Sequence, residues 1–114
     1  DARPAIEAAD LVLIPFAPSH VDFWATEAII DIAKKTKRKI LIQINRANHR
    51  SKLISETLSY ISSLKVKATD TLIGNRQIFV SSMGLGKTAV EKQRSGKAIQ
   101  EIKDISNQIL LEIK

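Results

Sequence analysis

The chain has 114 residues, the length of one small domain, without room for a second independent core. Hydrophobic residues make up 44% and charged residues 26%, which excludes the collagen-like and disordered classes. There is no cysteine, so disulfides, zinc–thiolate sites and thiol nucleophiles are excluded. Lysine and arginine number 18 against 12 aspartates and glutamates, and the net charge of +6 permits binding to phosphate backbones without specifying it.

The sequence contains no recognisable targeting or membrane segment. Its longest apolar stretch, residues 11–18, is interrupted by two prolines and is much shorter than the roughly 20 residues that a membrane span needs. The N-terminus has neither the basic nor the apolar part of a signal peptide. We therefore expect a cytoplasmic protein without membrane contact. The chain starts without methionine and inside a helical pattern, so we also expect it to be a piece of a longer protein.

The first half of the chain predicts a strand followed by a helix. Residues 10–16 form a nearly continuous apolar run, which is typical of a strand covered on both faces. Ser19 and Asp22 stand in a Ser-x-x-Asp pattern that marks the start of a helix. Apolar residues at helical spacing follow as far as Lys35, and they place Trp24 on the buried side of this helix.

The rest of the chain repeats this alternation. Residues 39–45 predict a second strand and residues 53–64 a second amphipathic helix. Residues 65–73 alternate apolar and polar, which favours a strand at the sheet edge. Residues 74–96 are rich in turns with short helical pieces, and residues 96–113 predict a terminal helix packed on the sheet. The order predicts an α/β fold with about three parallel strands and three main helices, arranged as helices on both faces of the sheet.

This fold predicts where ligands bind and where the chain associates. In parallel sheets, ligands bind beyond the carboxyl ends of the strands, which here are followed by residues 15–19, 45–50 and 74–76. No predicted strand is left to pair the outer edge of strand 10–16. An uncovered apolar edge favours self-association.

Four blocks of the sequence resemble ParA-type partition ATPases, in the family's order. Residues 9–23 resemble its pattern A-D-L-V-L-I-P-x-x-P-S-x-x-D, and residues 42–46 resemble its strand ending in Asn-Arg. Residues 73–79 are similar to I-x-x-R-x-x-[FY]. Residues 86–91 and 98–102 resemble the family's G-x-T-V-x-E and A-x-x-E-I ending. The resemblance covers the whole chain and is closest to small plasmid-partition members.

The resemblance implies a deviant P-loop ATPase that segregates plasmids or chromosomes. Such a protein binds ATP with Mg²⁺, forms a dimer around two nucleotides and coats DNA without reading its sequence. A ParB-like partner protein bound at the centromere site stimulates hydrolysis. The family's phosphate loop, K-G-G-x-G-K-[ST], and two aspartates precede the part that this chain matches. Residues 1–114 are therefore expected to form the C-terminal part of a P-loop NTPase-like domain, without catalytic residues and without activity alone.

The resemblance also assigns roles to individual residues. The nucleotide-binding positions are Asn45, which would contact the base, and Arg46, Gly74, Asn75, Pro15 and Pro18. The loop and dimer positions are Ser19 and Asp22, and the DNA-binding positions are Arg76, Lys87, Lys92, Arg94 and Lys97. Ordinary structural roles also remain open for these residues. Asn45 could form a turn, the prolines, Ser19 and Asp22 could end the strand and cap the helix that follows it, and the cations could lie on a solvated surface. Arg76 could equally be a DNA contact, a dimer contact or a solvated cap.

Two features are not expected to form sites. Residues 84–88, Gly-Leu-Gly-Lys-Thr, resemble the end of a P-loop, but Ser81 stands where the first glycine is needed and no strong strand precedes it. His20 and His49 lack the spacing of a metal site. Two other functions remain open: a self-associating interaction module without catalysis, and a DNA-binding fragment that acts through charge alone.

Overall fold

The sheet is parallel and has three strands in the order β1-β2-β3. The computed structural model describes residues 2–18 and 20–114, and for residues 20–22 the backbone only. The strands are β1 (Val12–Phe16), β2 (Ile40–Ile44) and β3 (Lys67–Ala68). β1 pairs with β2 along its whole length, from Val12 opposite Ile40 to Phe16 opposite Ile44. The predicted first and second strands are therefore confirmed.

The third strand forms at the predicted edge but is short. β3 pairs only with Leu41 and Ile42 of β2. The hydroxyl of Thr69 donates to the carbonyl of Thr71 at 2.7 Å, and this turn takes the following residues out of the ladder. Pairing resumes in a single parallel bridge between Ala47 and Gly74. The predicted strand 65–73 is thus divided into two short contacts, and the second one positions Gly74 beside the end of β2.

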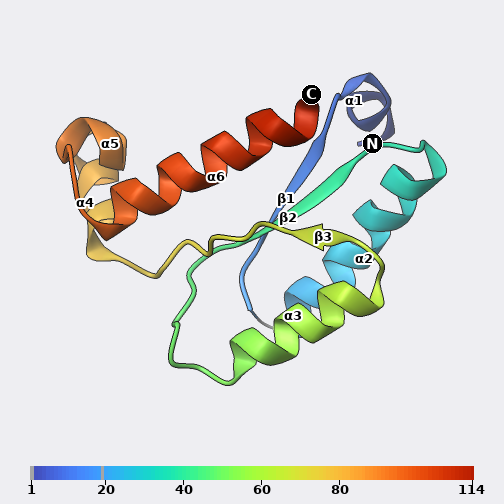
Figure 1. Ribbon diagram of the computed structural model, residues 1–114, viewed down its shortest axis with the longest axis horizontal. Helices are drawn as coiled ribbons and strands as arrows, with labels where there is room; N and C mark the ends of the chain where they lie inside the picture. The colour runs from blue at the N-terminus through green and yellow to red at the C-terminus, as the bar shows by residue number, and fades with distance from the viewer. Residues whose placement is uncertain (1, 19) are drawn as a thin grey trace.

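Helices lie on both faces of the sheet, as the α/β prediction requires. The helices are α1 (Arg3–Ala8), α2 (His20–Lys35), α3 (Leu53–Ser63), α4 (Gln77–Gly84), α5 (Ala89–Lys92) and α6 (Lys97–Ile113). α2 and α3 lie on one face, whereas α6 runs along the other (Figure 1). The short helices α4 and α5 lie at one end of the long axis, past the start of α6 (Figure 1). None of the helices in the described part of the chain combines the length and apolarity that crossing a bilayer requires.

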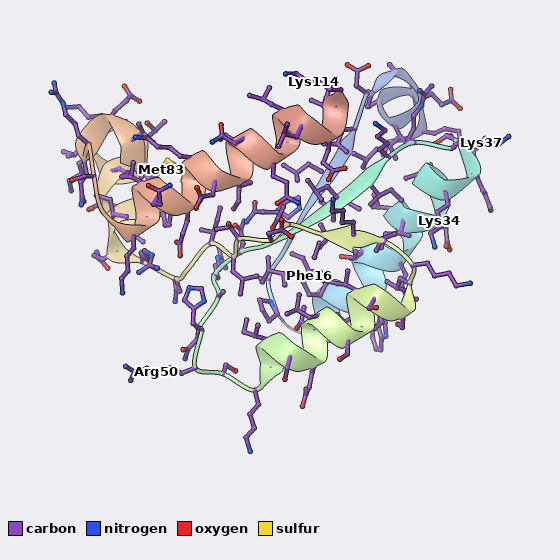
Figure 2. All side chains as sticks on the ribbon, in the orientation of Figure 1. Phe16, Lys34, Lys37, Arg50, Met83 and Lys114 are labelled. Carbon is purple, nitrogen blue, oxygen red and sulfur yellow. The ribbon has the colours of Figure 1, made fainter. Side chains whose placement is uncertain are left out.

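The carboxyl ends of α2, α3 and α6 gather at the end of the molecule away from α4. Lys34 and Lys37 lie there, far from Met83 of α4 (Figure 2). The ammonium of Lys34 donates to the carbonyl of Leu64, just after α3. Lys39 donates to the carbonyl of Glu112 in the last turn of α6 at 2.8 Å. These two cations compensate the partial negative charge and unpaired carbonyls of helix ends, so Lys34 and Lys39 have a structural role.

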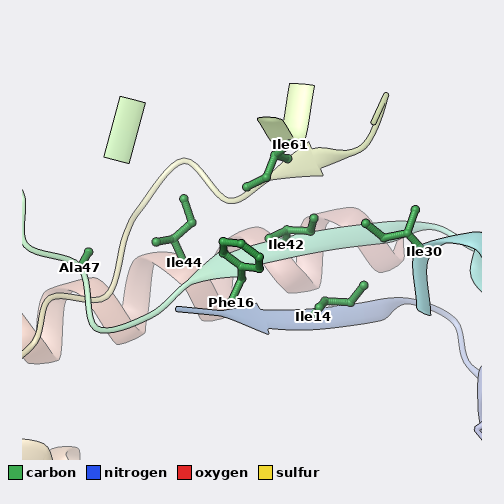
Figure 3. Close-up of a cluster of buried hydrophobic side chains, with 7 residues drawn as sticks. All are labelled: Ile14, Phe16, Ile30, Ile42, Ile44, Ala47 and Ile61. Atoms are coloured by element: carbon green, nitrogen blue, oxygen red, sulfur yellow. The ribbon is translucent and has the colours of Figure 1, made fainter. Parts of the chain in front are cut away.

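The main core lies between the sheet and the α2–α3 layer. Figure 3 shows its seven buried members, which come from both long strands, from α2 and α3, and from the loop after β2: Ile14, Phe16, Ile30, Ile42, Ile44, Ala47 and Ile61. Because side chains alternate along a strand, the even-numbered residues of β1 and β2 share this face. Phe16 also stacks on Phe23 of α2, with ring centroids 5.2 Å apart.

The buried side of α2 differs from the predicted one. Trp24 is 78% exposed, so its placement in the core was wrong. The residues that face the sheet are Thr26, Ile30 and Ala33, with Phe23 partly buried beside them. α2 carries apolar residues around most of its circumference, and the sequence pattern alone did not select the face that packs.

The second face of β1 is also more open than predicted. Leu41 and Gln43 of β2 point toward α6 and are 1% and 6% exposed, but Leu13 of β1 is 39% exposed and Pro15 is exposed too. The expectation that β1 is covered on both faces was therefore wrong for these described residues, because α6 lies over β2 rather than β1. β1 does form the outer edge of the sheet, as predicted. α6 forms as predicted, but its last turns leave Leu110 59% and Ile113 44% exposed.

Candidate functional site

A cavity of about 600 Å³ opens where β2 and the Gly74 bridge end. Three segments line it: the end of β2, the loop before α4, and one side of α4. Its lining residues are Gln43, Asn45, Arg46, Ile73, Gly74, Asn75, Arg76, Phe79, Val80 and Met83. The structure thus brings together four of the six predicted nucleotide positions, Asn45, Arg46, Gly74 and Asn75.

The two predicted prolines lie elsewhere. Pro15 is an exposed residue of β1. Pro18 lines a separate, small cavity of about 100 Å³ with Arg46 and Asn48. Ser19 lies outside the described residues, and Asp22 belongs to α2 without a described side chain. The roles predicted for these four residues stay predictions.

Asn45 is held at the mouth of the cavity by its backbone and its side chain. Its N–H donates to the carbonyl of Phe16 at 2.8 Å, which continues the β1–β2 ladder by one residue. Its side-chain oxygen accepts a hydrogen bond from the amide nitrogen of Gln43. Arg46 then adopts a φ of 50°, a left-handed conformation that turns the chain away from the sheet and leaves its side chain exposed. The half-buried Asn45 amide therefore lies at a fixed position in the cavity wall.

Glu101 of α6 ties the loop before α4 to the rest of the molecule. The guanidinium of Arg76 binds it in a bidentate pair, with Nε–Oε1 at 3.1 Å and Nη2–Oε2 at 2.8 Å. The backbone N–H of Gly74 donates to the same Oε1 at 3.2 Å. His49 Nε2 lies 3.5 Å from Oε2. A single carboxylate thus connects α6 with both loops at the strand ends.

The Arg76 guanidinium lies against the backbone of Gly74. A Cβ added at this position would come within 3.0–3.1 Å of the guanidinium atoms. The resemblance left the contact at this position open, since many ParA relatives have proline there. A proline would also lack the N–H that binds Glu101. In this chain, Gly74 and the Arg76–Glu101 pair form one unit.

Replacing Glu101 with glutamine is expected to reduce stability at neutral pH by about 2 kcal/mol, since charged hydrogen bonds of a well-shielded carboxylate are lost. Partial burial raises the pKa of Glu101, but hydrogen bonds from Arg76, Gly74 and His49 outweigh it and hold the pKa below its usual 4.5. The carboxylate therefore stabilises the fold above pH 4.5, and this contribution is lost as the pH falls through the lowered value.

Urea unfolding from pH 7 down to pH 3 measures this contribution. Wild type is expected to lose stability below about pH 4.5, and Glu101→Gln to lack that part of the decline. Glu7→Gln, at an exposed residue of α1, is the control for the loss of one negative charge. Equal pH curves for wild type and Glu101→Gln would show that the ion pair does not stabilise the fold.

The predicted DNA-binding cations fall into two groups. Four of them are exposed. Lys87 lies just before α5, Lys92 ends it, Arg94 lies between α5 and α6, and Lys97 begins α6; we call them the α5–α6 cations. Arg76 is instead paired with Glu101, and its side chain is 28% exposed. Contact of Arg76 with DNA stays a prediction, and such a contact would compete with this ion pair.

As the sequence analysis predicted, residues 84–88 do not form a phosphate-binding loop. The segment begins at Gly84, the last residue of helix α4, so a helix precedes it instead of a strand, and Gly86 takes a φ of 69° in the turn between α4 and α5. The Thr88 hydroxyl accepts from the N–H of Glu91 at 3.2 Å, and the Glu91 carboxylate accepts from the N–H of Thr88 at 3.0 Å. Thr88 therefore caps α5 in a capping box. Among the described residues, no cluster of three or more histidines, aspartates and glutamates could hold a metal ion.

Sequence reasoning missed several residues of the cavity. Phe79, Val80 and Met83 form its apolar side, and Gln43 and Glu101 hold its polar residues. Gln43 did carry a signal, since it is a polar residue inside an otherwise apolar strand. Glu101 belongs to one of the four ParA-like blocks but had no role assigned.

Comparison with known proteins supports a ParA-like relationship. The chain is 29% identical over 107 residues to the maintenance of carboxysome distribution protein A of Halothiobacillus neapolitanus. The aligned region covers 89% of this chain and 50% of that protein, so the chain spans about half the length of the curated relative it matches. No family model matches the chain. The similarity agrees with the ParA-like pattern of the four sequence blocks.

Proposed function

We propose that residues 1–114 form the C-terminal part of a ParA-like ATPase that segregates or positions its cargo along DNA, and that the strand-end cavity binds the adenine of ATP. The cavity carries this proposal, because it combines the Asn45 amide with an apolar wall at the place where parallel sheets bind ligands. The similarity to a protein concerned with carboxysome distribution supports a positioning role. Its cargo here would be a replicon or another cellular body.

The chemistry of the cavity suits a purine base. Phe79, Val80 and Met83 offer an apolar surface for the face of a ring, and the amide of Asn45 offers donors and an acceptor for its edge. The volume of about 600 Å³ falls within the range of roughly 300–1,000 Å³ that is usual for small-molecule sites. Gly74 and Asn75 contribute the backbone of the facing loop.

The described residues of the cavity fit the base and not the metal. They include two arginines and no carboxylate, whereas Mg²⁺ prefers oxygen ligands. Mg²⁺ and the phosphates would be held mainly by residues outside 1–114, and ATP hydrolysis would need them. Bound ATP would supply the energy for cycling between dimeric and monomeric states. The amino ends of α2 and α3 lie at the same end of the sheet and favour an anionic ligand there.

The α5–α6 cations extend the proposal to DNA. All four are exposed and belong to adjacent segments, so they could contact successive phosphates without reading bases. In the ParA-like scheme, the protein forms a homodimer on DNA, and a ParB-like protein at the centromere site stimulates it.

A self-associating module is the second candidate function. It is favoured by the free edge of β1 and by Leu13, which is 39% exposed on the strand that has no outer neighbour among the described residues. Such a module would assemble equally well with and without a nucleotide. It offers no explanation of the cavity.

Titration of the ¹⁵N-labelled chain with adenosine tests the proposed cavity by NMR. The base alone is expected to bind with a Kd on the order of 1 mM and to shift the amide signals of Asn45, Gly74 and Asn75. Asn45→Ala is expected to weaken binding about tenfold, through the loss of one or two hydrogen bonds. Asn48→Ala is the matched control, since Asn48 is exposed and does not line this cavity. Signal changes away from the cavity, or equal binding by Asn45→Ala, would contradict the proposal.

A further inference from the structure

Gln43 is buried in the middle of the central strand, where an amide is costly. It is 6% exposed, and its neighbours along β2 are Ile42 and Ile44. An amide without hydrogen bonds in such a place destabilises a protein, because it gives up its hydrogen bonds to water. Gln43 avoids this cost through two hydrogen bonds, and the second one reaches the proposed base contact, Asn45.

The carbonyl of Ile44 fixes which way the Gln43 amide points. Its oxygen lies 3.2 Å from Nε2 of Gln43, and a carbonyl oxygen can only accept. The atom of Gln43 that faces it must therefore be the nitrogen. The same nitrogen donates its other hydrogen to Asn45.

This arrangement in turn determines the orientation of Asn45. Because Gln43 presents a donor, Asn45 must turn its oxygen toward it. The Asn45 Nδ2 is then the atom left to donate to a ligand, and Oδ1 keeps one lone pair. The Ile44 carbonyl thus fixes the orientation of the Gln43 amide, and Gln43 in turn fixes the orientation of the Asn45 amide that faces the cavity.

We infer that Gln43 is a positioning residue that holds Asn45 in the orientation that selects adenine over hypoxanthine. This inference rests on the proposed purine site. Adenine presents the N1 acceptor beside the N6 amino donor, which match the donor and the remaining acceptor of a fixed Asn45. Hypoxanthine carries a hydrogen on N1 and an oxygen in place of the amino group, so the same edge offers a donor beside an acceptor, in the reverse order. Asn45 could adapt to that edge only by turning over and breaking its bond to Gln43.

Selectivity between adenosine and inosine tests this role. Wild type is expected to bind adenosine about tenfold more tightly than inosine, the effect of roughly one hydrogen bond. Gln43→Met keeps the length of the side chain but has no amide, and is expected to reduce the ratio to about threefold or less. Gln77→Met, at an exposed position of α4, is the matched control and should keep the wild-type ratio.

A second readout requires no ligand. In wild type, the side-chain amide protons of Gln43 are expected to exchange with solvent at least tenfold more slowly than those of exposed Gln77. The wild-type measurement remains decisive if the variant fails to fold.

The outcomes separate this inference from the proposed function. Adenosine binding with an unchanged adenosine-to-inosine ratio in a folded Gln43→Met variant would overturn the role of Gln43 and leave the purine site intact. Exchange of the Gln43 amide as fast as that of Gln77 would overturn it as well. Binding of neither nucleoside by wild type would overturn the purine site and the selectivity together.

Discussion

Replacing the four α5–α6 cations, Lys87, Lys92, Arg94 and Lys97, with alanine is expected to abolish most of the affinity for duplex DNA. Each cation that neutralises a phosphate contributes about 0.9 to the slope of log K against log salt concentration, so the slope should fall by roughly 3.6 if all four do so. At about 0.1 M salt this corresponds to a loss of a hundredfold or more. Fluorescence anisotropy with a labelled duplex of unrelated sequence, between 50 and 300 mM salt, measures both quantities. Arg76 is left unchanged because its guanidinium is already paired with Glu101.

The control must remove the same charge at another place. Lys35, Lys37, Arg38 and Lys65 are exposed and belong to the carboxyl ends of α2 and α3. Lys37 lies at the end of the molecule opposite Met83 (Figure 2). Replacing these four with alanine lowers the net charge from +6 to +2, as in the first variant. If both variants lose equal affinity, the binding depends on net charge and the assignment to the α5–α6 cations is wrong.

The elements were predictable because each one carries a strong local pattern. Two solid apolar runs predicted β1 and β2, and helical spacing predicted α3 and α6, all within a few residues of their observed bounds. The face of α2 was not predictable in the same way. Trp24 is 78% exposed because of the way α2 lies on the sheet. That position is decided by the Phe16–Phe23 stacking and other long-range contacts. The exposure of Leu13 likewise depends on long-range packing, because α6 lies over β2 and leaves Leu13 uncovered.

The candidate site was predictable only where strands end. The rule for parallel sheets brought Asn45 and Gly74 together from positions far apart in the sequence. The residues that hold them were not predictable, because Glu101 is distant along the chain from Gly74 and Arg76 and meets them only through the packing of α6. Gln43 illustrates the same limit: its polarity was visible, but its bond to Asn45 depends on the local geometry at the end of β2.

Two aromatic-to-alanine variants should differ widely in stability and so test the corrected core. Phe16 is 1% exposed and stacks on Phe23, and Phe16→Ala is expected to reduce the free energy of unfolding by roughly 3–5 kcal/mol. Small domains are stable by about 5–15 kcal/mol, so this variant should be close to unfolding at 37 °C. Trp24→Ala removes a larger side chain, but one that is 78% exposed, and its effect should stay within about 0.5 kcal/mol.

Urea unfolding followed by circular dichroism compares the two variants. Fluorescence is unsuitable, because Trp24 is the chain's one tryptophan and is absent from the second variant. An exposed indole should also change its emission little when wild type unfolds, which is an independent check of its position. A loss of 2 kcal/mol or more in Trp24→Ala would return Trp24 to the core and would mean that α2 packs on the sheet through a different face. A small loss for Trp24→Ala beside a large one for Phe16→Ala would instead place the core between β1, β2 and the Phe23 side of α2.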